Sequence, residues 1–362
     1  MVHIANPVIK EEELEGIKEV LDSGMLAQGE VVADFEKEFA DYLGVKYGKA
    51  VANGTAALDV AMKSLGIGEG DEVITSPFSF IASANCIMFQ GAKPVFADIK
   101  DDTFNLDPEK VKEKITEDTK AILPVHLFGQ PADMSAFVEI AEEHDLYLIE
   151  DCAQAHGAEY DGKKVGSFGD IGTFSFYPTK NMTTGEGGIV VTDDEELAER
   201  ADLVRDHGQS EKYTHDMLGY NLRMTNIAAS IGRAQLERLD EFNEKRIRNA
   251  EMLTSGIEKI KGLTPPKVED YVKHVFHQYI IKVEEEYPLN RQELREKLHD
   301  NDIGTAVHYP KTIPEQPLYS ENGYSSDGYP KANDCVKKVL SLPIHPKVSE
   351  NDIEDMLEVL EV

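Results

Sequence analysis

Residues 120–151 read KAILPVHLFGQPADMSAFVEIAEEHDLYLIED, and this stretch decides the expected fold. Apolar runs stand at its two ends, from Lys120 to His126 and from Leu146 to Glu150, and a charged segment typical of a helix lies between them. A helix that connects two strands makes a parallel pair, since antiparallel neighbours need only a short turn. Ligand sites of parallel sheets lie beyond the carboxyl ends of the strands, which is where Asp151 stands.

The same alternation of short apolar runs and amphipathic segments continues on both sides of this stretch. It includes a helical pattern from Leu14 to Leu21 that ends at Gly24, a typical C-terminal cap. Alternating strands and helices predict an α/β fold with a mostly parallel sheet. The other strands predicted are Glu72–Thr75, Lys93–Asp98, Thr173–Phe176 and Gly188–Thr192.

The character of the chain changes from about Gln235. A long charged helix is predicted from Gln235 to Ile260, followed by an apolar strand from Gln278 to Val283. A last helix begins at Ser349, which has an acidic residue three positions later, as in a capping box. We therefore predict a large α/β domain over residues 1–240 and a smaller α+β domain over residues 241–362.

The chain has 362 residues, of which 68 are acidic and 37 basic, so that its net charge is −31. Such a charge repels nucleic-acid phosphates and anionic lipids, which argues against both as partners. Hydrophobic residues make up 41%, enough for a packed core. The acidity fits either an ordinary protein kept soluble by its charge or a modest adaptation to a salty cytoplasm.

The three cysteines, Cys86, Cys152 and Cys335, are too few and too scattered for a disulfide framework or a zinc cluster. No metal is therefore expected. No apolar run approaches the 18 or so residues of a membrane span, and the segment from Met1 to Pro7 lacks the pattern of a signal peptide. We expect a cytoplasmic protein without a membrane segment.

Three short segments carry residue types suited to chemistry, and the first is Asn53 to Ala57. It lies between an apolar run and a helical stretch, and it contains Gly54 and Thr55. A helix start of this kind offers backbone N–H groups and a hydroxyl to a phosphate. Taken alone, it fits a plain N-terminal cap better.

The second segment ends in Asp151, beside apolar Ile149. A carboxylate there is partly desolvated and needs a partner, which a protonated pyridine nitrogen, a helix start or a salt bridge would supply. The third segment places Lys180 between an aromatic strand and a glycine-rich turn. Dehydration lowers the pKa of a lysine and yields a nucleophilic amine, although most lysines are simply solvated.

The order of these segments matters more than any one of them. Their order is the layout needed to hold pyridoxal 5′-phosphate (PLP). A phosphate-binding helix start comes first, then a carboxylate after a strand, and then Ser175 and Lys180, five residues apart. That cofactor requires a phosphate cradle, an acid on its ring nitrogen and a lysine on its aldehyde.

At this point the sequence resembles the DegT/DnrJ/StrS-type sugar aminotransferases, PLP enzymes of the aspartate-aminotransferase-like fold, also called fold type I. The resemblance runs through nearly the whole chain. The matching segments are 24–29, 52–58, 70–74, 91–98, 149–158, 166–170 and 219–224.

The resemblance implies a role for each matching residue. Lys180 would bond to the aldehyde of PLP as a Schiff base and shuttle a proton, and Asp151 would keep the ring nitrogen protonated. Gln154 would face the 3-hydroxyl, and Phe80 would stack on the ring. The phosphate would be bound by Gly54, Thr55, Ala56 and Ser175.

Other implied roles concern the substrate and a second subunit. Asn221 would reach the phosphate in the neighbouring subunit, which implies a homodimer with shared active sites. His308 and Tyr309 would approach the substrate, although a His-Tyr-Pro turn can be purely structural. Arg223 would hold the carboxylate of the amino donor or form a structural ion pair.

The implied reaction moves an amino group from an amino acid, such as glutamate, to a keto group of a nucleotide-linked sugar. We expect the acids to lie on outer helical faces, such as 11–19 and 193–199, and the active site to be a locally positive cleft. Two alternatives remain open: a cysteine desulfurase that uses Cys335, and a regulator that binds PLP or nucleotide sugar without turnover. Lys180 argues against the family's dehydratase branch, which has a histidine there.

Overall fold

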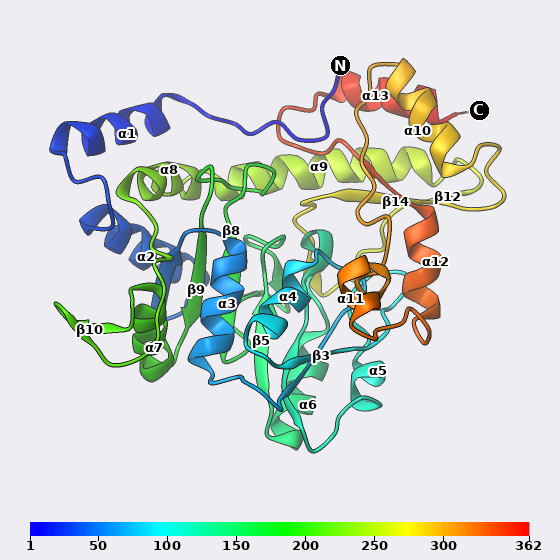
Figure 1. The fold of residues 1–362 in the computed structure, drawn as a ribbon. Coiled ribbons are helices and arrows are strands. Elements are labelled where there is room, and N and C mark those ends of the chain that lie inside the picture. Colours follow the sequence, from blue (N-terminus) through cyan, green and yellow to red (C-terminus); the bar gives the residue numbers. More distant parts are fainter. Residues whose placement is uncertain (362) are drawn as a thin grey trace.

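A seven-stranded sheet forms the core of the first 200 residues in the computed structural model, which describes residues 1–361 (Figure 1). The five strands from β8 to β3 pair in parallel, whereas β9 is antiparallel to both of its neighbours. The predicted α/β fold with a mostly parallel sheet is therefore confirmed. The spatial order is β1 (Tyr47–Val51), β9 (Gly188–Thr192), β8 (Ile171–Ser175), β5 (Tyr147–Asp151), β4 (Thr119–Leu123), β2 (Glu72–Thr75) and β3 (Lys93–Phe96).

Helices cover both faces of this sheet. Neighbouring strand residues point to opposite faces, and accordingly Val190 packs in one apolar cluster and Ile189 in another. Burial on both faces explains why these strands are nearly continuous apolar runs. One face is covered by α3 (Gly54–Ser64), α4 (Ala82–Phe89) and α7 (Glu195–Arg205), and the other by α2 (Glu30–Leu43) and α6 (Met134–His144).

The secondary structure differs from the prediction most clearly in one helix and one strand. The predicted charged helix from Gln235 to Ile260 is two helices, α8 (Asn226–Leu236) and α9 (Leu239–Ile257). They break at Arg238, which leaves helical geometry (φ −113°) and donates a hydrogen bond to buried Glu13. The strand predicted to end at His126 stops at Leu123, because Pro124 has no N–H for the ladder.

The C-terminal third packs along α9 (Figure 1). Its antiparallel sheet consists of β12 (Leu263–Thr264), β14 (Tyr279–Val283) and β15 (Val339–Leu342). The helix predicted after Ser349 is α13 (Glu350–Leu360), and Ser349 and Asp352 form the expected capping box. The remaining elements are α1 (Glu11–Ser23), α5 (Pro108–Lys112), α10 (Arg291–Asp300), α11 (Pro317–Glu321), α12 (Pro330–Lys338), β6 (Glu159–Tyr160), β7 (Lys163–Lys164), β10 (Gln209–Glu211), β11 (Thr214–His215) and β13 (Val272–Lys273).

The N-terminal segment crosses between the two parts of the molecule. Val2 forms a bridge with Ile303, and Gln235 donates a hydrogen bond to the carbonyl of Val8. The chain then turns into α1, whose C-terminal cap is Gly24 in the left-handed conformation (φ 72°), as predicted. This course carries Ile4 and Ala5 past the carboxyl ends of the central strands.

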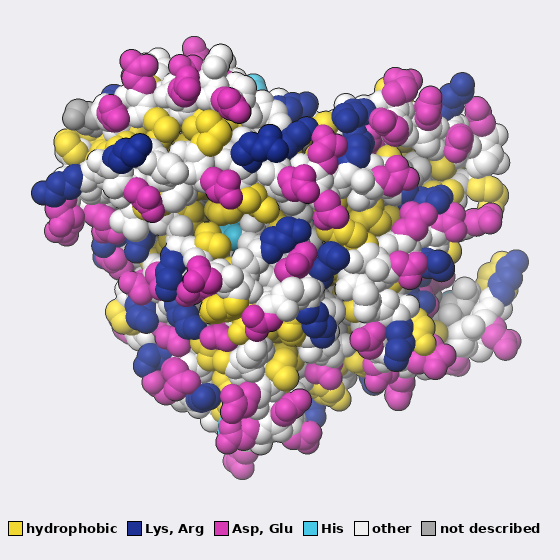
Figure 2. Space-filling view, turned by 180° about the vertical axis from the view of Figure 1, so that it is seen from behind, with side chains coloured by type: hydrophobic (Ala, Val, Ile, Leu, Met, Phe, Trp, Pro, Cys, Tyr) yellow, Lys and Arg dark blue, Asp and Glu magenta, His cyan; other side chains and the backbone are white. Residues whose placement is uncertain are grey.

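Acidic side chains are spread over the surface and mixed with basic ones (Figure 2). The acids of the 193–199 segment are exposed, as expected. In α1 the exception is Glu13, which is buried against Arg238. Among the residues described, no helix is both long and apolar enough to cross a membrane.

Candidate active site

A cavity of about 740 Å³ opens at the carboxyl ends of β5 and β8, the place expected for a ligand site in a parallel sheet. This volume is typical of sites for cofactors and small molecules. Its walls include Lys180, Asp151, Ser175 and Phe80, together with the start of α3. The structure thus brings together segments that lie more than a hundred residues apart in the sequence.

Lys180 lies in the turn that follows β8. Hydrogen bonds fix this turn: the Lys180 N–H donates to the carbonyl of Tyr177, and the Thr183 hydroxyl donates to that of Phe176. The side chain is half-buried because it borders the cavity. Burial lowers the pKa of Lys180 to about 8, although the charge of Asp151 opposes the shift. A substantial fraction of this amine is therefore neutral at mildly alkaline pH.

Asp151 is the last residue of β5 and is buried. Its Oδ2 accepts a hydrogen bond from the Ser83 hydroxyl at 2.8 Å, and its Oδ1 accepts one from the N–H of Ala153 at 3.1 Å. Burial raises the pKa of Asp151, and these hydrogen bonds oppose the rise. No ion pair to Asp151 is found within residues 1–361. The carboxylate is thus placed to receive a cationic group from a ligand.

The start of α3 meets the end of β8 at the cavity. A Cβ on Gly54 would lie 2.5 Å from the Cβ of Ser175, so that only glycine permits this approach. The side chain of Asn53 caps the helix by accepting the N–H of Ala56 at 2.9 Å. The N–H of Ala56 is therefore already bonded in this structure, whereas Gly54 and Thr55 line the cavity.

The far wall of the cavity is aromatic and polar. Phe80 is 54% exposed, and its ring centroid lies 6.3 Å from that of Tyr309. Gln154 donates to the Tyr309 hydroxyl at 3.1 Å and accepts the N–H of Phe128 at 2.8 Å. His308 shares a hydrogen bond of 2.7 Å with Ser341, and burial lowers the pKa of His308 to about 4.

These features fit PLP. The glycine-dependent cradle at Gly54 suits the phosphate, buried Asp151 suits a protonated ring nitrogen, and Lys180 suits the aldehyde. When bound, PLP supplies an electron sink that stabilises negative charge on the carbon next to an amino group. The roles of the individual residues remain predictions.

Three predicted residues do not line this cavity: Ala56, Asn221 and Arg223. Asn221 is exposed and forms a bridge with Asp206, and Arg223 forms an ion pair with the same aspartate. Arg223 thus forms the structural ion pair that was the alternative to its role in binding the donor. The prediction of a positively charged cleft is wrong. The charged side chains that line the cavity are Lys180, Asp151 and Glu186, of which one is basic and two are acidic.

Several lining residues were not predicted from the sequence. Ser83 holds Asp151, and His277 and Gln278 enter the cavity just before β14. Their position next to an apolar strand was the only local signal. Ile4 and Ala5 carry no signal at all, because only the path of the N-terminal segment brings them here.

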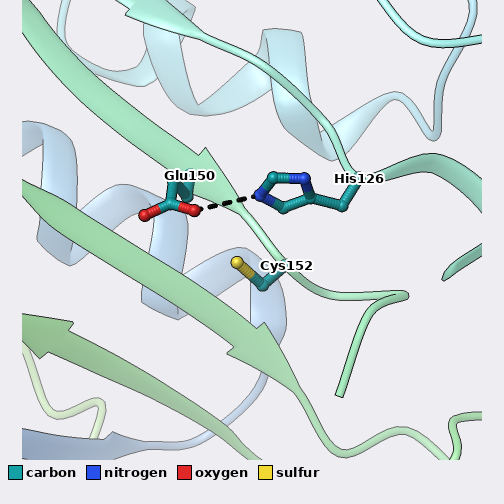
Figure 3. A group of neighbouring side chains, drawn as sticks. All are labelled: His126, Glu150 and Cys152. Atoms are coloured by element: carbon teal, nitrogen blue, oxygen red, sulfur yellow. Dashed lines mark hydrogen bonds and ion pairs between the residues drawn. The ribbon is translucent and has the colours of Figure 1, made fainter. Parts of the chain in front are cut away.

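His126, Glu150 and Cys152 lie close together behind the cavity and have the side chains of metal ligands (Figure 3). The polar atoms of His126 and Glu150 already have partners: His126 Nε2 contacts Glu150 at 3.1 Å, and its Nδ1 accepts the N–H of Ala132. Glu150 also accepts three backbone N–H groups from the turn at residues 166–169. This group therefore holds the turn against β5, and burial raises the pKa of the Cys152 thiol.

The fold and the site together define a PLP-dependent aminotransferase of fold type I. The chain belongs to the DegT/DnrJ/EryC1/StrS aminotransferase family, whose model matches residues 7–361.

The chain is similar to proteins of sugar metabolism over nearly its full length. It is 41% identical to the spore coat polysaccharide biosynthesis protein SpsC of Bacillus subtilis, over 98% of this chain and 95% of SpsC. It is 40% identical to the GDP-perosamine synthase of Escherichia coli O157:H7, over 97% and 95%. The PLP form of the putative sugar aminotransferase Spr1654 from Streptococcus pneumoniae superimposes with a TM-score of 0.94 at 30% identity, over 99% and 97%.

Proposed function

We propose that this enzyme transfers an amino group from an amino acid, such as glutamate, to a keto group of a nucleotide-linked sugar. The observation that carries the proposal is the shared cavity of Lys180 and Asp151, which has a volume of about 740 Å³. It has room for the cofactor and part of a large second substrate. The relatives named above support a sugar as the acceptor.

In this proposal, Lys180 Nζ would move a proton from the Cα of the donor to the C4′ carbon of the cofactor. When the amine passes to the sugar, it would move a proton from C4′ to the former keto carbon. Its lowered pKa leaves an amine able to accept that proton at mildly alkaline pH. Asp151 holds a proton on the cofactor ring by its negative charge. Tyr309 and Phe80 bound the space in which the acceptor sugar lies, and the small number of charged groups there suits a hydroxyl-rich ligand.

We also propose that the enzyme is a homodimer in which Asn221 serves the neighbouring active site. Support comes from large apolar side chains that are exposed shortly before Asn221 in the chain. On the hairpin of β10 and β11, Tyr213 is 80% exposed, and Leu218 just after it is 72% exposed. This hairpin projects from the body of the molecule (Figure 1). Large apolar side chains exposed on a projecting hairpin are typical of an interface.

A cysteine desulfurase is the second function considered for this fold. It would need a thiol in the cavity, but Cys335 is buried in α12, away from the residues that line the cavity. Burial raises the pKa of Cys335 to about 12, so this thiol is not a ready nucleophile. All three cysteines are free and buried, which suits the reducing cytoplasm proposed as its location.

The proposed function is tested by adding donors to the PLP-loaded enzyme one at a time. Glutamate should change the absorbance of the bound cofactor and release 2-oxoglutarate, and a nucleotide-linked keto sugar should then restore the spectrum. Formation of alanine from cysteine, with release of sulfide when a thiol reductant is added, would favour the desulfurase. An unchanged spectrum with every donor would favour a regulator without turnover.

A further inference from the structure

A second and much smaller cavity adjoins the active site. Its volume is about 20 Å³, room for one water molecule or one small ion. It lies between the N-terminal segment of residues 4–8, the turn of residues 178–183 and helix α9. The residues that line both cavities are Ile4, Ala5, Thr179, Lys180 and His277.

The charges around this small cavity are of one sign. Lys180 and Arg246 are both among its lining residues, and no lining residue is an aspartate or glutamate. Arg246 is only 5% exposed. Its Nη1 donates to the carbonyls of Phe276 and His277, at 3.1 and 3.3 Å, but its Nε–H has no acceptor. No ion pair to Arg246 is found within residues 1–361.

Arg246 is an exception among the buried arginines of this chain. Arg205, which is 3% exposed, pairs with both Glu36 and Asp202. Arg238, which is only partly buried, also pairs with an acid, the buried Glu13. A guanidinium does not escape the cost of burial by losing its proton near neutral pH, and a buried charge without a counter-charge is strongly destabilising. Burial lowers the pKa of Arg246 only to about 10, so it stays charged.

We propose that the cavity beside Arg246 binds a small monovalent anion, which accepts a hydrogen bond from the Arg246 Nε–H and neutralises the guanidinium. His277 Nδ1 also lacks a partner and lies at the same cavity, where it can contribute a second contact. Two sources share this chemistry: a halide from solution, and a carboxylate of the amino donor that reaches in past Lys180. The second source rests on the proposed function, whereas the first does not.

A water molecule is the competing occupant. Asn181 Oδ1 is buried without a donor and lines the same cavity, so one water could accept from Arg246 and donate to Asn181. Water would satisfy these hydrogen bonds but would leave the charge of Arg246 uncompensated. The two occupants therefore differ in their response to added anions.

Crystals of the PLP-loaded enzyme soaked in sodium bromide provide the direct test. We expect an anomalous bromide peak within hydrogen-bond distance of Arg246 Nε. In solution, the melting temperature should rise with chloride and then saturate, at an ionic strength held constant with sulfate. The rise should be absent in Arg246→Met. It should persist in the control Arg248→Met, which removes an exposed charge from the same helix.

Steady-state kinetics with the amino donor distinguish a halide from the donor carboxylate as the occupant of the site. If the donor carboxylate uses the site, chloride should raise the KM for the donor without changing kcat. Arg246→Met should raise this KM at least tenfold. Arg246→Lys should raise it less, because a positive charge is kept. If the site holds only a halide, bromide should bind and the donor KM should not depend on chloride. The bromide experiment stays decisive even if the enzyme transfers no amine. Absence of bromide at Arg246, together with a donor KM unchanged in Arg246→Met, would overturn the proposal.

Discussion

Ser83 holds the carboxylate on which the proposed chemistry depends. Its hydroxyl donates to Asp151 Oδ2 at 2.8 Å, and a hydrogen bond to a charged acceptor is worth about 1.5–3 kcal/mol. Ser83→Ala should therefore lower kcat roughly tenfold and move the pH profile of the cofactor absorbance. Ser79→Ala is the matched control, because Ser79 contacts Ser83 and not Asp151. Equal effects of the two variants would contradict this role.

Lys180 also predicts how stability depends on pH in the enzyme without cofactor. The pKa of Lys180 is lowered from 10.5 to about 8 in the folded protein, because the side chain is desolvated. Between these values the unfolded chain binds more protons, so the contribution of Lys180 to stability rises with pH. Urea unfolding should show that Lys180→Met is more stable than wild type at pH 7 and that this advantage shrinks towards pH 10. A constant difference would show that the lysine is not desolvated.

At the scale of single residues, the sequence predicted those cavity-lining residues that lie at or just beyond the end of a strand. Asp151 and Ser175 stand at the ends of strands, and Lys180 lies in the turn beyond one. His277 and Arg246 lack such a signal, since their position depends on how the C-terminal third packs against the sheet.

At the scale of elements, the junction of α3 with β8 explains the need for Gly54. An added Cβ would collide with Ser175, and relief would require the start of the helix to move. Gly54→Ala should weaken binding of PLP at least tenfold, as measured by equilibrium dialysis or cofactor fluorescence, because the phosphate cradle opens. Gly68→Ala is the control, since a Cβ there meets no atom within 4 Å. Unchanged PLP affinity in Gly54→Ala would exclude this junction as the cradle.

Glu150 ties β5 to the turn at residues 166–169. Burial alone would raise the pKa of Glu150, but its bonds to His126 and to backbone N–H groups outweigh burial and lower it. This stabilisation is present above the unfolded pKa near 4.5 and is lost as the pH falls below it. Glu150→Gln should cost about 2–4 kcal/mol at pH 7, since several donors lose a charged acceptor. The cost should shrink in acid, and exposed Glu143→Gln should change little in chemical denaturation.

Element boundaries were harder to predict than element types. β1 was not predicted as a strand. It lies at the edge of the sheet, and its five residues include polar Lys49, so they form no continuous apolar run. The break between α8 and α9 was missed because neither Gly nor Pro marks it. There the pairing of Arg238 with Glu13, 225 positions apart, overrides the local helical pattern.

At the scale of the whole molecule, the proposed dimer predicts complementation between inactive variants. Lys180→Ala removes the proposed base, and Asn221→Ala removes a group proposed to serve the neighbouring site. Mixed subunits should regain about a quarter of wild-type activity, because half of the dimers are hybrids with one intact site each. Sedimentation should show a dimer for both variants. If the mixture gains no activity, Asn221 acts within its own subunit or not at all.

The central claim is that Lys180 carries out amine transfer to a nucleotide-linked keto sugar. Its most direct test is to incubate the PLP-loaded enzyme with [15N]glutamate and a panel of nucleotide-linked 3-keto and 4-keto sugars, and to measure the products by mass spectrometry. We predict that one of these sugars acquires the labelled amine and that Lys180→Ala yields none. Full transfer by Lys180→Ala, or glutamate turnover without label in any sugar of the panel, would contradict the claim.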